Sequence, residues 1–135
     1  MSRSPQPSPR RILFMEPRVE GHHLLWLSLV GEDLVKAGHH VTFAIDNRTD
    51  EALNRVRDLA PNLLHDGNIL PLYGSDKRLL KGSLLKTAAF CLHKCQANEV
   101  FFNSLDEFTS SAFRLAVFGL RPPSILKGKI SGIYH

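Results

Sequence analysis

The sequence predicts a Rossmann-like α/β fold, with an open parallel sheet and helices on both of its faces. Short apolar runs alternate with longer stretches in which apolar residues recur every three or four positions. The first strand, helix and second strand follow one another within residues 11–46. Two strands joined by a helix in this way lie parallel and side by side, with the helix packed across them.

The opening unit shows each of these elements in turn. Residues 12–16, "ILFME", form a short apolar run that ends at Pro17, as a buried strand does. Residues 21–37 carry apolar side chains at helical spacing, and Gly38 follows them as a helix-ending glycine. The β-branched and aromatic run "HVTFAID", residues 40–46, then predicts the second strand.

The remainder of the chain repeats the alternation. Residues 1–10 are rich in Pro and Ser and predict a disordered tail, so the folded domain is expected to span residues 11–135. The same patterns predict helices over 50–59, 81–97 and 106–118, and strands over 69–74, 100–105 and the final stretch 127–135.

Composition narrows the classes of function. The formal charge of +4 is spread along the chain without a dense basic block, which argues against a nucleic-acid partner and is compatible with an anionic ligand or peripheral membrane contact. Cys91 and Cys95 are four residues apart on one helical face, and they predict reduced thiols and a cytoplasmic location, including the inner face of the membrane. No apolar run is long enough to span a bilayer, and no spacing predicts a metal site.

The loop after the first strand contains the first candidate site. Arg18, Gly21 and His22 lie where the carboxyl end of a strand leads into a helix, which is where ligands bind in open α/β sheets. A tight turn at the surface is the alternative interpretation. A second Gly-His-His, residues 38–40, lies at the opposite edge of the sheet, where helix termination explains its glycine.

The loop after the fourth strand contains the second candidate site. Ser104, Asp106 and Glu107 lie at the start of a predicted helix and could form hydrogen bonds with a hydroxyl-rich ligand, or only cap the helix. Asp46 ends the second strand, where a nucleotide-binding unit places a ribose-binding acid. The glycine triplet that accompanies such an acid is missing, so a structural role is expected for Asp46.

The stretch from Arg11 to Asp46 resembles the N-terminal domain of GT-B-fold glycosyltransferases, the family 4-like N-terminal domain. The motifs that carry the resemblance are Gly21-His22 after the first strand and "AGHHVT", residues 37–42, before the second. A weaker resemblance to a later strand-helix unit of such a domain covers residues 100–123.

This resemblance implies a nucleotide-sugar-dependent transferase with no other cofactor. In that family the N-terminal domain holds the acceptor, a sugar or a lipid-linked sugar, and a C-terminal domain binds the nucleotide-sugar donor. Gly21 would let the ligand approach, and His22, the candidate catalytic residue, would lie near the reacting hydroxyl. In inverting members of the family a base of this domain deprotonates the acceptor, and in retaining members no such base is needed. No donor domain follows residue 135, so we expect an acceptor-side half, inactive alone, whose C-terminal half is on another chain or is lost from a fragment.

Two other interpretations stay open. One is a non-catalytic Rossmann-like module that binds a partner protein or a nucleotide. The other is a flavodoxin-like or response-regulator-like domain, which is disfavoured because the segment "ILPLYG" after the second helix supplies no phosphoacceptor Asp. The sequence leaves the donor, the acceptor, the stereochemical outcome and the oligomeric state undetermined.

Overall fold

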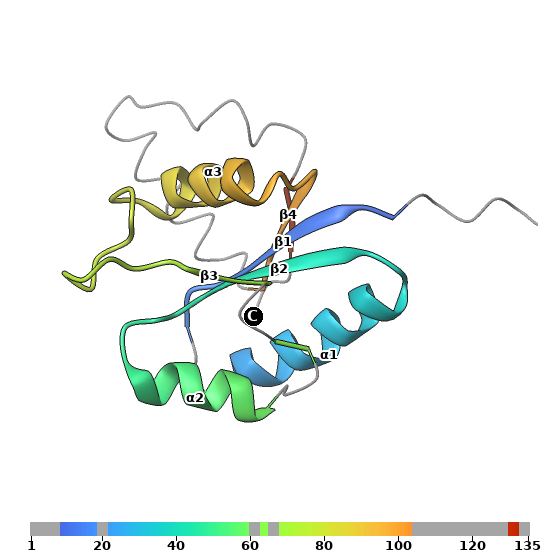
Figure 1. Cartoon of the computed structure of the whole chain (residues 1–135), viewed down its shortest axis with the longest axis horizontal. Coiled ribbons are helices and arrows are strands. Elements are labelled where there is room, and N and C mark those ends of the chain that lie inside the picture. Colours follow the sequence, from blue (N-terminus) through green and yellow to red (C-terminus); the bar gives the residue numbers. More distant parts are fainter. Residues whose placement is uncertain (1–8, 19–21, 60–62, 65–67, 104–129, 133–135) are drawn as a thin grey trace, which may run out of the picture.

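A parallel sheet with helices on both faces forms the centre of the molecule, which confirms the predicted α/β class (Figure 1). The computed structural model describes residues 9–18, 22–59, 63–64, 68–103 and 130–132, with the backbone alone at residues 22, 24, 59 and 130–132. Within these ranges the strands are β1 (Arg11–Glu16), β2 (His40–Ile45), β3 (Ile69–Pro71), β4 (Glu99–Phe102) and β5 (Ile130–Gly132), and the helices are α1 (His22–Lys36), α2 (Asp50–Leu59) and α3 (Leu84–Cys95).

The strands are ordered β3-β2-β1-β4-β5, and every neighbouring pair is parallel. This is the order of the Rossmann fold, and it differs from the 2-1-3-4-5 order of flavodoxin-like and response-regulator-like domains. The flavodoxin-like interpretation is therefore excluded. The order reverses between β1 and β4, and in open α/β sheets ligands bind at this switch point, beyond the carboxyl ends of the strands.

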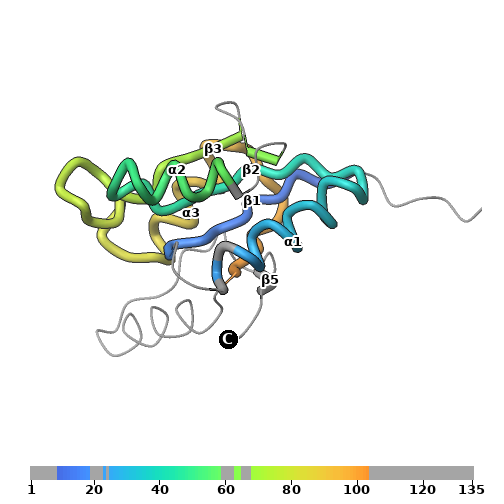
Figure 2. The backbone as a smooth tube through the Cα atoms, turned by 90° about the horizontal axis from the view of Figure 1, so that it is seen from below, coloured from blue at the N-terminus to red at the C-terminus, as the bar shows by residue number. Residues whose placement is uncertain are grey.

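Each face of the sheet is covered by different helices. Helices α1 and α2 lie below the sheet in Figure 1, and α3 lies above it; Figure 2 shows α1 and α2 next to each other across the lower face. The side chains of β1 alternate between the two faces of the sheet. Phe14 packs in the core between the sheet and α1, whereas Leu13 and Met15 pack in the core between the sheet and α3. Burial on both faces explains why this strand reads as an unbroken apolar run.

Local capping sets where the helices end. Gly38 has a φ of +91°, and its N–H donates to the carbonyl of Val35 while the N–H of His39 donates to Leu34, a glycine-ended cap that confirms its predicted role. Helix α3 is shorter than the predicted 81–97, because Ser83 caps its start and Gln96 adopts a left-handed conformation after its end.

The described helices and the two cysteines bear on the broad class of the protein. None of the helices in the described ranges is long and apolar enough to cross a membrane. Cys91 and Cys95 are free thiols on α3, as predicted. Burial raises the pKa of Cys91 to about 11 and also raises the pKa of Cys95, so both are predominantly protonated at neutral pH.

Two leucines of α1 test whether this helix packs on the sheet as described. Leu27 has 1% of its surface exposed and Leu29 has 48%. Leu27→Ala is expected to lower the free energy of unfolding by about 2–5 kcal/mol, because it leaves a cavity against the sheet. Leu29→Ala, the matched control, is expected to change it by less than about 0.5 kcal/mol. Urea unfolding followed by Trp26 fluorescence measures both values, and equal losses would contradict this packing.

Candidate functional site: the carboxyl edge of the sheet

Three buried polar side chains lie at the carboxyl ends of three adjacent strands. Glu16 ends β1, Asp46 follows β2, and Asn103 follows β4; their exposed fractions are 0%, 4% and 0%. Burial of a polar group is unfavourable unless hydrogen bonds replace those to water. The contacts of these three residues therefore define how this edge is built.

Glu16 connects two strands to the first helix. One of its carboxyl oxygens accepts the backbone N–H of Arg18 at 2.9 Å, and the other accepts the side-chain amide of Asn103. The Nδ1 atom of His23 lies 3.6 Å from this second oxygen. The same Asn103 amide also donates to the backbone carbonyl of His23 at 2.9 Å. These contacts hold the start of α1 against the switch point between β1 and β4.

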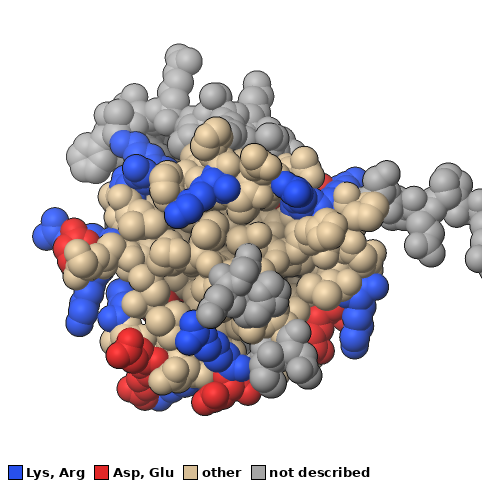
Figure 3. All heavy atoms as spheres, in the orientation of Figure 1, with Lys and Arg blue, Asp and Glu red and all other residues tan. Residues whose placement is uncertain are grey.

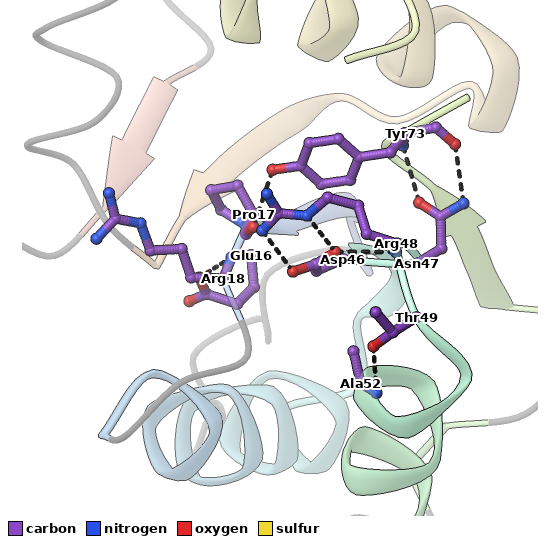
Figure 4. Close-up of polar contacts among 9 residues, drawn as sticks. All are labelled: Glu16, Pro17, Arg18, Asp46, Asn47, Arg48, Thr49, Ala52 and Tyr73. Carbon is purple, nitrogen blue, oxygen red and sulfur yellow. Dashed lines mark hydrogen bonds and ion pairs between the residues drawn. The ribbon is translucent and has the colours of Figure 1, made fainter. Parts of the chain in front are cut away.

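Asp46 forms a two-pronged ion pair with Arg48. The Nε and Nη2 atoms of Arg48 donate to the two carboxyl oxygens of Asp46 at 2.9 and 2.8 Å, and the backbone N–H of Arg48 adds a third hydrogen bond at 3.0 Å (Figure 4). An aspartate that is bound in this way has a structural role, because its carboxyl oxygens accept hydrogen bonds from its own loop. The structural role expected for Asp46 fits this geometry.

The Arg48 side chain continues the network toward the loop after β3. Its guanidinium lies 4.4 Å from the ring centroid of Tyr73, and the Tyr73 hydroxyl donates to the carbonyl of Pro17 at 3.0 Å. The side chain of Asn47 both donates to and accepts from the Tyr73 backbone, each at 2.8 Å. Figure 4 shows these residues converging from the segments that follow β1, β2 and β3. The carboxyl edge is thus cross-linked by side chains over three strands.

The first turn of α1 is the part of this edge best suited to meet a ligand. Helix α1 begins at His22 and has no acidic residue in its first turn, so its N-terminal N–H groups and the positive end of its dipole attract anions and hydroxyl oxygens. Glu16 and Asp46 both accept hydrogen bonds from within the protein. The carboxyl groups of both acids are therefore engaged in contacts that hold the edge together.

The residues predicted from sequence are only partly placed. Arg18 is exposed two residues beyond β1, and its side chain extends away from the Arg48–Tyr73 cluster (Figure 4). The backbone of His22 starts α1, directly beyond this strand. Gly21, the side chain of His22, and the predicted residues Ser104, Asp106 and Glu107 lie outside the described part of the structure. In the described ranges there is no group of three His, Cys, Asp or Glu residues that could hold a metal ion.

Sequence reasoning did not anticipate the Glu16–Asn103 contact or the Arg48–Tyr73 contact. A signal for the first was present, since each of these two polar residues directly ends or follows an apolar strand run, "ILFME" and "VFFN". Adjacent strands bring such terminal residues together at one edge. The strand order needed to recognise that β1 and β4 are neighbours comes from the structure.

Searches of protein-family models, of curated proteins and of solved structures find no match to this chain.

Substitution of Arg48 tests the network around Asp46. Arg48→Gln removes the two side-chain hydrogen bonds to a carboxyl group that is 4% exposed, and we expect the free energy of unfolding to fall by about 1–3 kcal/mol. Arg55→Gln is the matched control because it breaks an exposed ion pair with Glu51 on α2, with an expected loss below about 0.5 kcal/mol. Urea unfolding measures both, and a loss for Arg48→Gln no larger than that of the control would refute this role.

Proposed function

We propose that the chain is the acceptor-binding half of a nucleotide-sugar-dependent glycosyltransferase and that it does not transfer sugar alone. The observation that carries this proposal is that α1 begins at His22, beyond the carboxyl end of β1, with Gly21 directly before it in the sequence. That position borders the switch point of a 3-2-1-4-5 sheet, where open α/β folds bind ligands.

The acceptor would lie across the carboxyl edge, with a hydroxyl near the first turn of α1. The N–H groups of that turn and the exposed Arg18 would form hydrogen bonds with its oxygens. His22 would act as the general base for the attacking hydroxyl, as an inverting mechanism requires. Glu16 and Asn103 would position this turn without contacting the acceptor, since they are fully buried.

The donor side of the reaction would come from a second Rossmann-like domain. In this proposal the nucleotide-sugar is bound there, the acceptor is a sugar or a lipid-linked sugar, and transfer takes place in the cytoplasm or at the inner face of the membrane. The sequence resemblance over residues 11–46 supports this two-domain arrangement, and the strand order agrees with a Rossmann-like fold for the half described by this chain.

A non-catalytic binding module is the second candidate, and an exposed apolar surface favours it. Leu25, Trp26 and Leu29 have 53%, 38% and 48% of their surfaces exposed on the first half of α1. Large exposed apolar side chains that cluster on one helix are typical of protein–protein contacts. In this case the carboxyl edge would hold a nucleotide or a partner segment, and no transfer would follow.

Sugar transfer by the purified chain, alone and mixed with the products of neighbouring genes, distinguishes these candidates. With a panel of nucleotide-sugars, we expect transfer only in the mixture. His22→Ala is expected to lower the transfer rate by about 10²–10⁴-fold, the usual contribution of a general base. His39→Ala is the matched control because it changes the equivalent position of the second Gly-His-His, at the other edge of the sheet.

The possible outcomes separate the proposals clearly. Transfer in the mixture that is lost in His22→Ala and kept in His39→Ala supports the acceptor-half proposal. Transfer by the chain alone would contradict the need for a separate donor domain. Binding of a nucleotide or a partner protein without any transfer, by both the wild-type chain and His22→Ala, would support the binding-module candidate.

A further inference from the structure

An open pocket lies at the opposite edge of the sheet, where β1 and β2 begin. It has a volume of about 380 Å³ and lies between these strand starts and the C-terminal end of α3. Among the described residues, strand β3 pairs with only the last three residues of β2, from Phe43 onward, so no described strand lies beside the start of β2 on that side. Helix α3 ends at Cys95, and the chain turns back at Gln96 into β4. In the described part of the chain, the pocket therefore lies beyond the start of a short edge strand and the end of a short helix.

The polar lining of this pocket is basic. Arg11, His40 and Lys94 contribute to it, with the hydroxyl of Thr42 and the thiol of Cys95 between them, and none of the described residues that line it is acidic. The rest of the lining is apolar and includes Leu70. A volume at the lower end of the range of ligand pockets, with an apolar floor and a few convergent polar groups, suits a small organic ligand.

The positive charges of the pocket are not neutralised within the described structure. The Nη1 atom of Arg11 donates to the side-chain oxygen of Gln96 at 3.2 Å, which orients the guanidinium without cancelling its charge. The nearby acid Glu99 is paired instead with Arg10. Lys94 lies 5.8 Å from the ring centroid of Phe90, a contact that also leaves its charge unopposed.

The C-terminal end of α3 opposes anion binding only weakly. A helix C-terminus carries about half a negative charge, which acts within the last turn. Here the carbonyls of Leu92 and His93 accept the N–H groups of Ala97 and Gln96, so they are satisfied locally. The two full positive charges of Arg11 and Lys94 outweigh the remaining half charge.

We propose that this pocket binds an organic phosphate, with the phosphate between Arg11 and Lys94 and the apolar part of the ligand against Leu70. Guanidinium and ammonium groups are the side chains that proteins use most to bind phosphate, and the Thr42 hydroxyl can add a further hydrogen bond. The site lies at the amino ends of the strands, away from the carboxyl edge, and does not depend on the glycosyltransferase proposal. A ligand here lies at the opposite edge of the sheet from the start of α1.

Figure 3 supports a basic character for this side of the molecule. On the face that it shows, Lys and Arg side chains lie over α3 and the start of β1 as well as along the edge formed by α1 and α2, whereas most Asp and Glu side chains lie along that edge alone. The stretch from Lys77 to Asn98 contains no Asp or Glu at all. This distribution of charge would draw anions toward the pocket before they bind.

Cys95 provides a reporter inside the pocket. In a Cys91→Ala background it is the single thiol of the chain, and its rate of reaction can be compared for a dianionic disulfide, 5,5′-dithiobis(2-nitrobenzoate), and a neutral one, 4,4′-dithiodipyridine. The ratio of the two rates cancels changes in the thiol itself and reports the local positive charge. We expect phenyl phosphate to slow the anionic reagent more than phenol does at the same concentration.

Charge substitutions in this background complete the test. Arg11→Gln and Lys94→Gln are each expected to lower both the rate ratio and the affinity for phenyl phosphate by about tenfold, because each removes hydrogen bonds to a charged group. Lys86→Gln, an exposed lysine of α3 that does not line the pocket, is the matched control and should change neither value.

Three results would overturn the proposal. The first is that phenyl phosphate does not protect Cys95, and the second is that phenol protects it equally. The third is that Lys86→Gln loses as much affinity as the pocket variants, which would indicate diffuse surface charge rather than a site. Arg11 and Lys94 are both exposed, so their substitution should leave the fold intact, and circular dichroism of each variant checks this.

Discussion

The buried contact between Glu16 and Asn103 is the constraint on which the carboxyl edge depends. Glu16 has no exposed surface, and removal of an ionisable group from water costs several kcal/mol unless strong hydrogen bonds replace hydration. Both of its oxygens accept hydrogen bonds, from the backbone N–H of Arg18 and the amide of Asn103. The chain can therefore bury the end of β1 only when β4 lies beside it, and this pairing creates the switch point of the sheet.

The two edges of the sheet are built differently, and this decides what each can bind. At the carboxyl edge, the Glu16 contacts and the Asp46–Arg48–Tyr73 network hold the segments after four strands in fixed positions. This edge is suited to the orientation of a ligand at the start of α1. At the amino edge Arg11, His40 and Lys94 are exposed, and in the described part of the chain a pocket lies where β2 extends beyond β3. Attraction of anions, rather than orientation of a reacting group, follows from that arrangement.

The sequence predicts the helices and strands that depend on residues close together in the chain. The predicted bounds of the strand, helix and strand in residues 11–46 agree with the structure to within a residue at most ends. The spacing of apolar residues and the Gly38 cap both depend on residues that are close together in the sequence. The end of α3 was missed because Gln96 takes a left-handed conformation that sequence associates with glycine. The Glu16–Asn103 contact spans 87 residues. Each residue ends or follows an apolar strand run, but their pairing depends on the order of the strands, which local patterns do not determine. The predictions for Gly21, Ser104, Asp106 and Glu107 concern residues outside the described ranges.

The free energy of unfolding of Glu16→Gln tests the central constraint most directly. The variant places an amide N–H₂ group against the donors of Arg18 or Asn103, and we expect a loss of about 2–4 kcal/mol from this buried mismatch. Glu99→Gln, which changes a partly exposed acid at the start of β4, should lose less than about 1 kcal/mol. A large loss confined to Glu16→Gln would support the role of this residue in holding the carboxyl edge together. A loss below about 1 kcal/mol for Glu16→Gln would contradict it, because a buried acceptor with two donors cannot be replaced at so small a cost.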